Sequence, residues 1–535
     1  MKNRILYCLL ALHSLALAQV PNLGLRVNTD GATEAYTLFS PEKATSVCLV
    51  DACGELVNEW TFGENPGLTV YLLDNGNLLR AGKDTIQIRT WENDPVWSFA
   101  INSQLGINQH HDIELLPNGN ILCIITDWHS SEDMHNLGKD TVNLPGRTKL
   151  DKIVELSPIG LDSAEVVWEW RFVDHLVQDF DSTKPGYGVI ANNPHRLDIN
   201  YPTAFGDDLT HVNSIDYNPF LDQIILSARS LDEVLIIDHS TTTQEAASSS
   251  GGSSNKGGDF LWRWGNPLVY DQGTLSDQKL RIQHDAKWVP EGYADAGMIS
   301  VFNNGGDSLG SNESSIVLID PIIINGTYEM QQNRFLPLDF EWSWKGDVLG
   351  ETVYEGKKSG AHMLPNGNVV FSETSKGQIS EISRVNNEIL WVYKNPLGSV
   401  IYNQEDTIQN SNNSIFRGER YMPNHPGLVG EDLSPVAILE DTNALSTFCK
   451  AYTATSLRNS EVLDVYFQQP LLDNQLRFTQ HVNDLNIALF DLMGRLVMDI
   501  HKFNGKVVYL DLSPGIYIVK FGQGVRENSS KLIIP

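Results

Sequence analysis

Short runs of alternating apolar and polar residues recur along the chain, and several are separated by an Asn-Gly pair. The clearest are LLDNGNLL from Leu72, LLPNGNIL from Leu115 and MLPNGNVV from Met363. Asn-Gly between alternating apolar segments is the strongest short-range signal for a two-residue hairpin turn. The pattern therefore predicts antiparallel β-hairpins at these three places.

Tryptophan marks a second repeat, because six strand-like segments each carry one in a similar context. They are NEW at Trp60, PVWSF at Trp97, VVWEWRF at Trp168, FLWRWGNP at Trp262, FEWSW at Trp342 and ILWVYKNP at Trp391. Units of several short strands that repeat with one aromatic mark each are typical of a β-propeller. We expect an all-β fold, a six-bladed β-propeller, with insertions where the spacing is uneven.

Two segments depart from this repeat. The run TTTQEAASSSGGSSNKGG, from Thr241 to Gly258, consists of small and polar residues and predicts a surface loop without a packed element. Near the C-terminus, the alternating runs LNIALFDLMGRLVMDI from Leu485 and KVVYLDLSPGIYIVKF from Lys506 predict hairpins of a small β-sandwich.

The N-terminus has the features of a secretory signal peptide. Lys2 and Arg4 precede an apolar stretch that is too short to span a membrane, and Ala16-Leu17-Ala18 supplies a small-residue cleavage site. We therefore expect a signal peptide at 1–18, a propeller at 19–440, a linker at 441–454 and a C-terminal β-sandwich at 455–535. The protein is expected to be exported.

Charge and cysteine content limit the partners. A formal net charge of -29 argues against nucleic acid, which requires clustered Lys and Arg, and means that an anionic substrate needs a local positive pocket. The cysteines left after signal removal lack zinc-site spacing. Cys48 and Cys53 are close enough in sequence to pair in an oxidising compartment, and the sequence leaves this open.

Three histidines begin strand-like runs in similar register. His111 and His284 each lie six residues before the proline of the next turn, and His211 reaches Asn218-Pro219 at nearly the same distance. Because side chains alternate along a strand, equal offsets predict that these imidazoles point to a shared centre. His110 leaves the choice between it and His111 open, while His362, three residues before its proline, is expected to face away and to be structural.

Several motifs together resemble the bacterial arylsulfate sulfotransferase family, a six-bladed propeller group. They are DLTHVNSIDYNP, QIILSARS, DHSTTTQEA, GGDFLWRWGNP, QHDAKW and VFNNG, with FRGERYMPNHPGLVGEDLSP as a closing segment. The resemblance covers roughly residues 22–435. At the C-terminus, DLMGRLV and LSPGIYIVKF are similar to the sorting domains that direct cargo through type IX secretion.

The resemblance implies roles for five residues. His284 corresponds to the histidine that becomes transiently sulfated, His211 and Asn213 to residues that hold the sulfuryl oxygens, and Arg229 to the arginine that neutralises them; His111 matches a histidine of the same site. These residue types suit the chemistry, since imidazole is neutral near pH 7 and Arg binds tetrahedral oxyanions well. Structural readings compete with these roles: contacts between blades for the histidines, an ion pair for Arg229 and an ordinary hydrogen bond for Asn213.

The leading hypothesis is an exported enzyme that transfers a sulfuryl group from an aryl sulfate to a phenolic acceptor, without a nucleotide sulfate donor, cofactor or metal. The implied partners are these small molecules and the type IX secretion machinery, and the final location is the cell surface or the medium, reached through the periplasm. One alternative is a propeller that binds sulfated or aromatic ligands without turnover; a weaker one is a quinone-dependent dehydrogenase. No motif indicates an oligomeric state.

Overall fold

The computed structural model describes residues 21–140, 142, 146–306, 312–404, 406–440, 475–491, 496–510, 512, 515–523 and 526–534. The predicted signal peptide and linker lie outside these residues, as does part of the predicted sandwich. The chain divides into two compact units, Met1–Cys449 and Lys450–Pro535. Among the described residues, no helix has the length and apolar character needed to cross a membrane.

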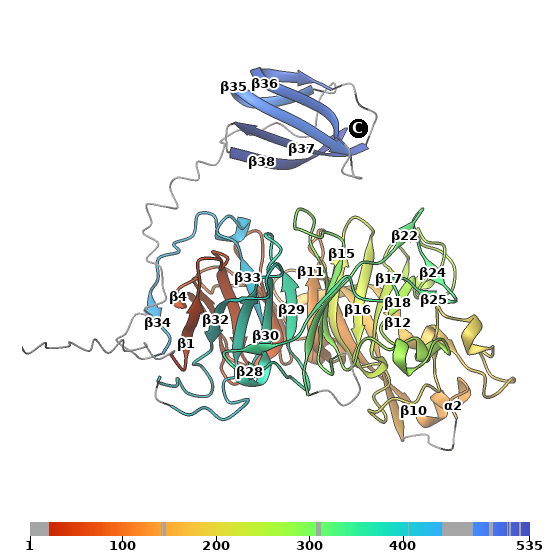
Figure 1. Ribbon diagram of the computed structural model, residues 1–535. Coiled ribbons are helices and arrows are strands. Elements are labelled where there is room, and N and C mark those ends of the chain that lie inside the picture. Colours follow the sequence, from red (N-terminus) through yellow and green to blue (C-terminus); the bar gives the residue numbers. More distant parts are fainter. Residues whose placement is uncertain are drawn as a thin grey trace, which may run out of the picture. The chain divides into compact units, whose positions relative to one another are not determined.

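In the first unit, the described residues form six antiparallel sheets of four or five strands (Figure 1). The first sheet contains β2 (Tyr36–Pro41), β3 (Ser46–Val50), β4 (Glu55–Thr61), β33 (Ile415–Tyr421) and β34 (Ala437–Ile438). The second contains β5 (Pro66–Leu72), β6 (Leu78–Gly82), β7 (Ile86–Arg89) and β8 (Pro95–Phe99), and the third contains β9 (Gln109–Leu115), β10 (Ile121–Ser130), β11 (Arg147–Ile159) and β12 (Ser163–Arg171).

The remaining three sheets follow in chain order. The fourth contains β15 (Val212–Asn218), β16 (Gln223–Ala228), β17 (Glu233–Asp238) and β18 (Trp262–Trp264). The fifth contains β19 (His284–Trp288), β20 (Ile299–Asn303), β21 (Ser315–Ile319) and β26 (Trp342–Trp344). The sixth contains β29 (Gly360–Met363), β30 (Val369–Glu373), β31 (Gln378–Ile382), β32 (Ile389–Lys394) and β1 (Gly24–Asn28).

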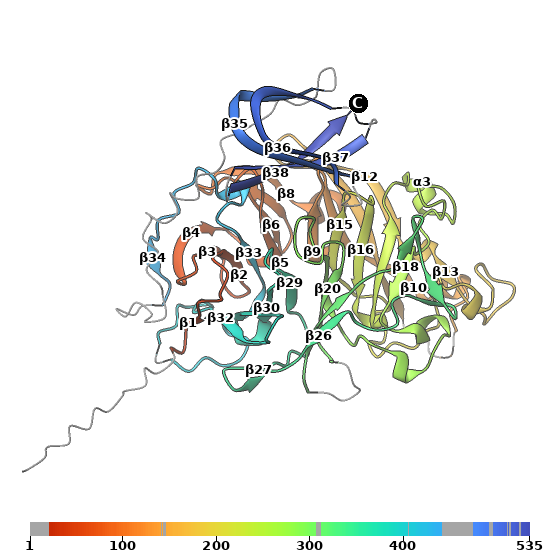
Figure 2. The ribbon, with the colours of Figure 1, turned by 45° about the horizontal axis from the view of Figure 1, so that its top comes forward.

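One edge strand from each sheet lies at the centre of this unit. These strands are β33, β5, β9, β15, β19 and β29; they contact one another in this order, and β29 contacts β33, so the ring closes. Figure 2 shows β33, β5, β9, β15 and β29 near the middle, with β4, β8 and β12 farther out. The fold is therefore all-β and propeller-like, and the starts of the central strands meet around one axis.

The ring is closed by strands from both ends of the unit. Late strand β33 pairs with early strand β2, and β1 pairs with β32. Two sheets are thus built from chain segments far apart in sequence, which ties the last sheets to the first. Closure places Phe416 and Arg417 of β33 beside the central strands.

The tryptophan repeat corresponds to one position in the sheets, the fourth strand from the centre. The six residues lie on β4, β8, β12, β18, β26 and β32. In five cases the indole N–H bonds to the adjoining sheet or to its connections. Trp60 donates to the Thr90 carbonyl at 2.8 Å, Trp97 to the Ser163 carbonyl at 2.9 Å and Trp391 to the Ala52 carbonyl at 2.9 Å. Trp168 donates to the Thr241 hydroxyl at 3.2 Å and Trp262 to the Leu336 carbonyl at 2.9 Å. A buried indole N–H needs such a partner, so the repeat marks contacts between sheets.

All three predicted Asn-Gly hairpins are present, between β5 and β6, β9 and β10, and β29 and β30. The prediction for Thr241–Gly258 needs correction. This segment contains the short helix α3 (Thr243–Ala246), which begins with a capping box from Thr242 and Glu245, and Ala246 is fully buried. Gly258 approaches so closely that a Cβ atom there would lie 2.0 Å from the Ala246 carbonyl oxygen. Small residues here permit packing.

Two further helices, α1 (Ile101–Leu105) and α2 (Ser131–Asn136), lie in connections. The unit also contains short two-stranded sheets: β13 (Leu176–Val177) with β14 (Leu197–Asp198), β22 (Ile323–Ile324) with β23 (Thr327–Tyr328), β24 (Met330–Gln331) with β25 (Arg334–Phe335), and β27 (Asp347–Val348) with β28 (Glu351–Thr352). These sheets lie in the connections that make the spacing of the repeat uneven.

The second unit contains β35 (Gln475–Asp491), β36 (Leu496–Tyr509), β37 (Gly515–Gln523) and β38 (Arg526–Ile534), which form one antiparallel sheet in the order β36-β35-β37-β38. The run from Leu485 is a hairpin, as predicted. The run from Lys506 is not, because β36 and β37 lie on opposite sides of β35 and do not pair. A two-layer sandwich stays a prediction.

Candidate functional site

His111 and His211 lie close together at the start of two neighbouring central strands. Their Nε2 atoms are 3.1 Å apart, so one ring donates an N–H hydrogen bond to the other. Nδ1 of His211 faces Asp208 Oδ2 at 2.5 Å. Burial would raise the pKa of Asp208, but the hydrogen bond and charge of His211 outweigh it and hold that pKa below its usual value. Asp208, His211 and His111 thus form a chain that can hold and pass a proton.

His110 does not belong to this chain of three residues, because its ring bonds a different carboxylate, that of Asp151. Its Nε2 lies 2.8 Å from Asp151 Oδ1, and the other oxygen of Asp151 accepts the Thr210 hydroxyl and the Val212 N–H, both at 2.7 Å. His110 therefore ties β9 to the start of β15. Of the two neighbouring histidines, His111 is the one whose Nε2 meets His211.

His284 begins β19 and is 2 % exposed. Its Nδ1 lies 2.8 Å from Asn304 Oδ1 and 3.1 Å from the Ile282 carbonyl, and its Nε2 accepts the Lys358 N–H at 3.0 Å. Burial lowers the pKa of His284 well below its ordinary value. The hydrogen bond to Asn304 opposes this shift without cancelling it. His284 is therefore a neutral imidazole at pH 7.

The charges around His284 act in the same direction as its burial. The pKa of His284 is lowered further by its neighbours Arg229, His211 and Arg417. Burial also lowers the pKa of His111, and the neighbouring His110 and His211 add to that effect. The structure brings the three predicted histidines together, and burial favours the neutral form of His284 and of His111.

Regular strand alternation does not explain this convergence, and the expectation that it would is wrong. His111, His211 and Asp285 have φ angles of 64°, 47° and 58°, in the left-handed region. Strand pairing is interrupted nearby, between Val212 and Ile215 and between His284 and Lys287. Left-handed residues turn the backbone locally and change the direction of the next side chain. The bends, rather than parity along a straight strand, aim the imidazoles.

Arg229 follows β16 and lies beside His211, because its N–H donates to the His211 carbonyl at 3.1 Å. Its guanidinium carbon sits 4.0 Å from the centre of the Phe205 ring. Within the described residues, its guanidinium makes no hydrogen bond or ion pair, and its Nε is buried without a partner. Burial lowers its pKa. A half-buried guanidinium with open donors is suited to bind an oxyanion.

Asn213 is fully buried in β15, where its Nδ2 donates to the Gln283 carbonyl at 2.7 Å while its Oδ1 has no partner among the described residues. The amide thus links β15 to the residue before His284. One of its N–H bonds is already used, and this limits how it can contact a ligand.

Arg417 of β33 lies in the centre of the site. Its NH1 bonds Asp112 Oδ2 at 2.8 Å, its NH2 donates to the Asn213 carbonyl at 3.1 Å, and its Nε lies 3.1 Å from Asp285. Asp285 therefore pairs with Arg417. These contacts fix β33, β9, β15 and β19 to one another directly beside the histidines.

A cavity of about 780 Å³ lies toward the other ends of the same strands. Its lining includes Leu72, Leu115, Trp288 and Tyr421, all at or next to strand ends. His362 also lines this cavity, with Nε2 3.7 Å from a Glu419 oxygen. None of the five predicted site residues lines it, so His362 is apart from the histidine cluster.

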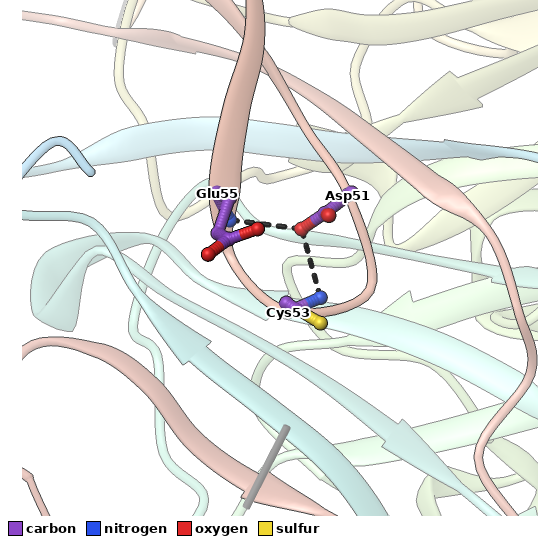
Figure 3. A group of neighbouring side chains, drawn as sticks. All are labelled: Asp51, Cys53 and Glu55. Carbon is purple, nitrogen blue, oxygen red and sulfur yellow. Dashed lines mark hydrogen bonds between the residues drawn. The ribbon is translucent and has the colours of Figure 1, made fainter. Parts of the chain in front are cut away.

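A small group outside this centre also has ligand-type side chains, as Figure 3 shows for Asp51, Cys53 and Glu55. Asp51 Oδ1 accepts the backbone N–H groups of Cys53 and Glu55, both at 2.9 Å, so the group is a capped turn between β3 and β4. Cys53 is disulfide-bonded and offers no thiolate. Cys48 is a buried free thiol, so the possible Cys48–Cys53 pair is not formed.

Three residues of the centre were not expected from the sequence: Asp208, Asn304 and Arg417. Asp208 carried a usable signal, because a carboxylate three residues before a histidine can reach its ring across a turn. Asn304 and Arg417 lie 20 and 133 residues from His284 in sequence, so only the fold brings them there.

The closed ring of sheets and its central histidines define a propeller-like protein with a buried polar centre. Residues 73–317 match the family model described as arylsulfotransferase (ASST), and residues 472–535 match that of the secretion system C-terminal sorting domain. Each of these segments is therefore similar to the family that its motifs predicted. The first match includes all five predicted site residues. A tail of this kind directs export to the cell surface or extracellular space.

No curated protein matches the chain. Several solved structures are similar in part. A protein of unknown function from Bacteroides caccae is 13 % identical, with 72 % of this chain and 99 % of that chain covered and a TM-score of 0.39. Virginiamycin B lyase from Staphylococcus aureus is 9 % identical, with 75 % and 96 % covered and a TM-score of 0.34. Apo AztD from Citrobacter koseri is 7 % identical, with 73 % and 99 % covered and a TM-score of 0.32.

Proposed function

We propose that the protein is an arylsulfate sulfotransferase, which moves a sulfuryl group from a phenolic sulfate ester to a phenolic acceptor through a sulfohistidine at His284, without a nucleotide sulfate donor. The observation that carries this proposal is a buried imidazole, neutral at pH 7, surrounded by a proton-sharing histidine pair and a guanidinium with open donors. The arylsulfotransferase match over the same residues supports it.

In the first half-reaction, the Lys358 N–H releases Nε2 of His284, whose lone pair then attacks sulfur. The N–S bond forms while the S–O bond to the aryl group breaks, and the departing oxygen keeps the electron pair. The His111–His211 pair supplies a proton to that oxygen, so a neutral phenol leaves. Arg229 faces the sulfuryl oxygens, whose charge dominates a loose transition state of this type.

In the second half-reaction, an acceptor phenol gives its proton back to the histidine pair. Its oxygen attacks sulfur, the S–O bond forms, and the N–S bond breaks with its electron pair returned to Nε2. The enzyme ends in its starting state. Asp208 supports both steps because its carboxylate holds Nδ1 of His211 and so fixes the orientation of that ring.

The decisive experiment is to mix the protein with 4-nitrophenyl sulfate without acceptor and to measure its intact mass. We expect the mass of one sulfuryl group to be added on the peptide that contains His284, and to be lost when phenol is supplied. His284→Gln should show neither this adduct nor transfer. His362→Gln, which alters a partly buried histidine at the other end of the strands, is the matched control and should keep both.

Saturable binding of the ester without release of 4-nitrophenol would favour a binding module instead. Full transfer by His284→Gln would remove the proposed nucleophile.

The finer features of the fold and of export belong to the same proposal. Six sheets around one ring support a six-bladed propeller. The sorting tail supports handling by the type IX secretion machinery, after a signal peptide has brought the chain to the periplasm. A chain that ends before residue 472 should keep its transferase activity and fail to reach the cell surface or medium.

A further inference from the structure

Asn304 directly follows β20 and is fully buried beside His284. Both N–H groups and the oxygen of its amide have a hydrogen-bond partner. Nδ2 donates to the Glu355 carbonyl at 2.9 Å and to the Lys358 carbonyl at 2.7 Å, and Oδ1 lies 2.8 Å from His284 Nδ1. Nothing in the arylsulfotransferase resemblance assigned this residue a role.

These contacts determine which way the amide faces. If the oxygen and nitrogen were exchanged, an amide oxygen would face two carbonyl oxygens within 3 Å, without any hydrogen between them. Only the present orientation gives every atom a partner of opposite kind. Oδ1 is therefore an acceptor, and the proton between it and the imidazole belongs to His284 Nδ1.

Two other contacts of His284 lead to the same arrangement. The Ile282 carbonyl, 3.1 Å from Nδ1, is also an acceptor, and the Lys358 N–H at 3.0 Å requires a lone pair on Nε2. We propose that Asn304 is a positioning residue that holds His284 as the neutral Nδ1–H tautomer and thereby makes Nε2 the atom that receives the sulfuryl group. This inference rests on the proposed function.

A neutral amide has a chemical advantage over a carboxylate here. When Nε2 bonds to sulfur, the ring gains a positive charge and Nδ1 keeps its proton, so the intermediate is an N-sulfoimidazolium. Asn304 accepts the hydrogen bond without removing that proton, and the ring stays a good leaving group for the second half-reaction. A carboxylate at this position would favour a protonated, non-nucleophilic ring before the reaction begins.

The same amide also organises the turn that faces the nucleophile. By binding the carbonyls of Glu355 and Lys358, Asn304 holds the segment whose Lys358 N–H points at Nε2. Lys358 and Ser359 have φ angles of 63° and 75°, so this segment depends on its surroundings to keep its shape. Asn304 thus holds Nδ1 of His284 directly and positions the Lys358 N–H that bonds Nε2.

The test begins with the unaltered protein carrying ¹⁵N-labelled imidazoles, with His284 assigned through His284→Gln. At pH 7, long-range ¹H–¹⁵N spectra should show a protonated Nδ1 and an unprotonated Nε2. Next, Asn304→Asp should raise the titration midpoint of His284 by at least one pH unit and move the acid limb of kcat/KM upward equally. Arg229, His211, Arg417 and His111 also face His284, and Asn304→Asp leaves them unchanged.

Asn303→Asp is a closely matched control. Asn303 is also buried, donates to two carbonyls, those of Lys279 at 3.1 Å and Gly306 at 2.9 Å, and accepts the Arg281 N–H at 2.8 Å. It does not bond His284. Both variants should lower the urea midpoint similarly, and only Asn304→Asp should change the imidazole titration.

A protonated Nε2 in the unaltered protein would overturn the inference without any variant being needed. So would an unchanged His284 titration in a folded Asn304→Asp protein. If the spectra and titration behave as expected but no sulfuryl transfer is found, the proposed function fails and the tautomer assignment stands.

Discussion

At the residue scale, the reactivity of the centre depends on two imidazoles kept neutral by burial and one held by a carboxylate. His284 and His111 have lowered pKa values, while His211 bonds Asp208. A nucleophile and a proton carrier thus differ in environment although they are the same amino acid. This difference makes their roles separable by pH and by substitution.

The first prediction concerns pH. Because burial lowers the pKa of His284 well below 6.5, the neutral form should persist through pH 6.5 and be lost only at lower pH. We expect kcat/KM for 4-nitrophenyl sulfate to stay constant from pH 7.5 to pH 6. It should begin to decrease only at pH values well below 6. An acid limb centred near 6.5 would show that His284 titrates as an exposed imidazole does.

The second prediction concerns Asp208. Asp208→Asn removes the carboxylate that holds Nδ1 of His211, so protonation of the leaving phenolate should slow and kcat should fall by about 10–100-fold. The loss should be larger for poor leaving groups such as phenyl sulfate than for 4-nitrophenyl sulfate, which needs little protonation. Asp207→Asn, at the neighbouring position, should have little effect. An equal loss with both esters would place Asp208 outside proton transfer.

At the element scale, neighbouring sheets are joined by specific polar contacts between buried apolar surfaces. His239 follows β17, and its ring bonds Glu155 of β11 at 3.0 Å and Asp222 at 2.8 Å. Burial would lower the pKa of His239, but these two carboxylates raise it to about 9. A charged histidine thus joins the third and fourth sheets.

The third prediction follows from this contact. Since the folded pKa of about 9 exceeds the unfolded value near 6.5, the stabilisation is fully present below pH 6.5 and is lost as pH rises through 9. His239→Gln should lower the free energy of unfolding by about 2 kcal/mol at pH 6, less than the shift alone implies because the Asp222 side chain is 43 % exposed. Urea unfolding at pH 6 and pH 9.5 measures this. A difference of equal size at both pH values would exclude an electrostatic origin.

The sequence patterns predict the secondary-structure elements better than they predict the site. The Asn-Gly hairpins depend on neighbouring residues, and the tryptophan strands depend on one repeated packing position. Both can therefore be predicted from the sequence without knowledge of the fold. The alternation of side chains along a regular strand predicted the direction of His111 and His211. That rule does not apply here because both residues have left-handed backbone angles, and neither is a glycine, the residue that would indicate such an angle in a sequence. Asn304 and Arg417 reach the centre through pairings far apart in sequence. The cluster of histidines was therefore predictable, and its hydrogen-bond partners mostly were not.

At the scale of the whole molecule, net charge opposes the expected substrate. The chain has a formal charge of -29, and an aryl sulfate is an anion. Long-range repulsion should slow their encounter at low ionic strength, while the cationic groups near the histidines act only at short range.

The fourth prediction is that kcat/KM for an aryl sulfate rises by roughly two- to fivefold between about 10 and 150 mM salt, as the screening length shortens from about 30 to about 8 Å. The neutral phenol acceptor provides an internal control, since its kcat/KM should barely change. Stopped-flow measurements with both substrates give this comparison. A decrease for the ester would mean that the basic groups at the centre dominate its approach.

The bonds around the histidine rings have a further consequence outside the cell. Imidazoles gathered this closely are good ligands for Zn²⁺ and Cu²⁺, and an exported protein meets such ions without cytoplasmic control. Here Nε2 of His284 is occupied by the Lys358 N–H, and the Nε2 atoms of His111 and His211 bond each other. A scavenging metal would have to break these bonds before it could bind any of the three Nε2 atoms. The contacts that orient the rings also protect these nitrogen atoms from chelation.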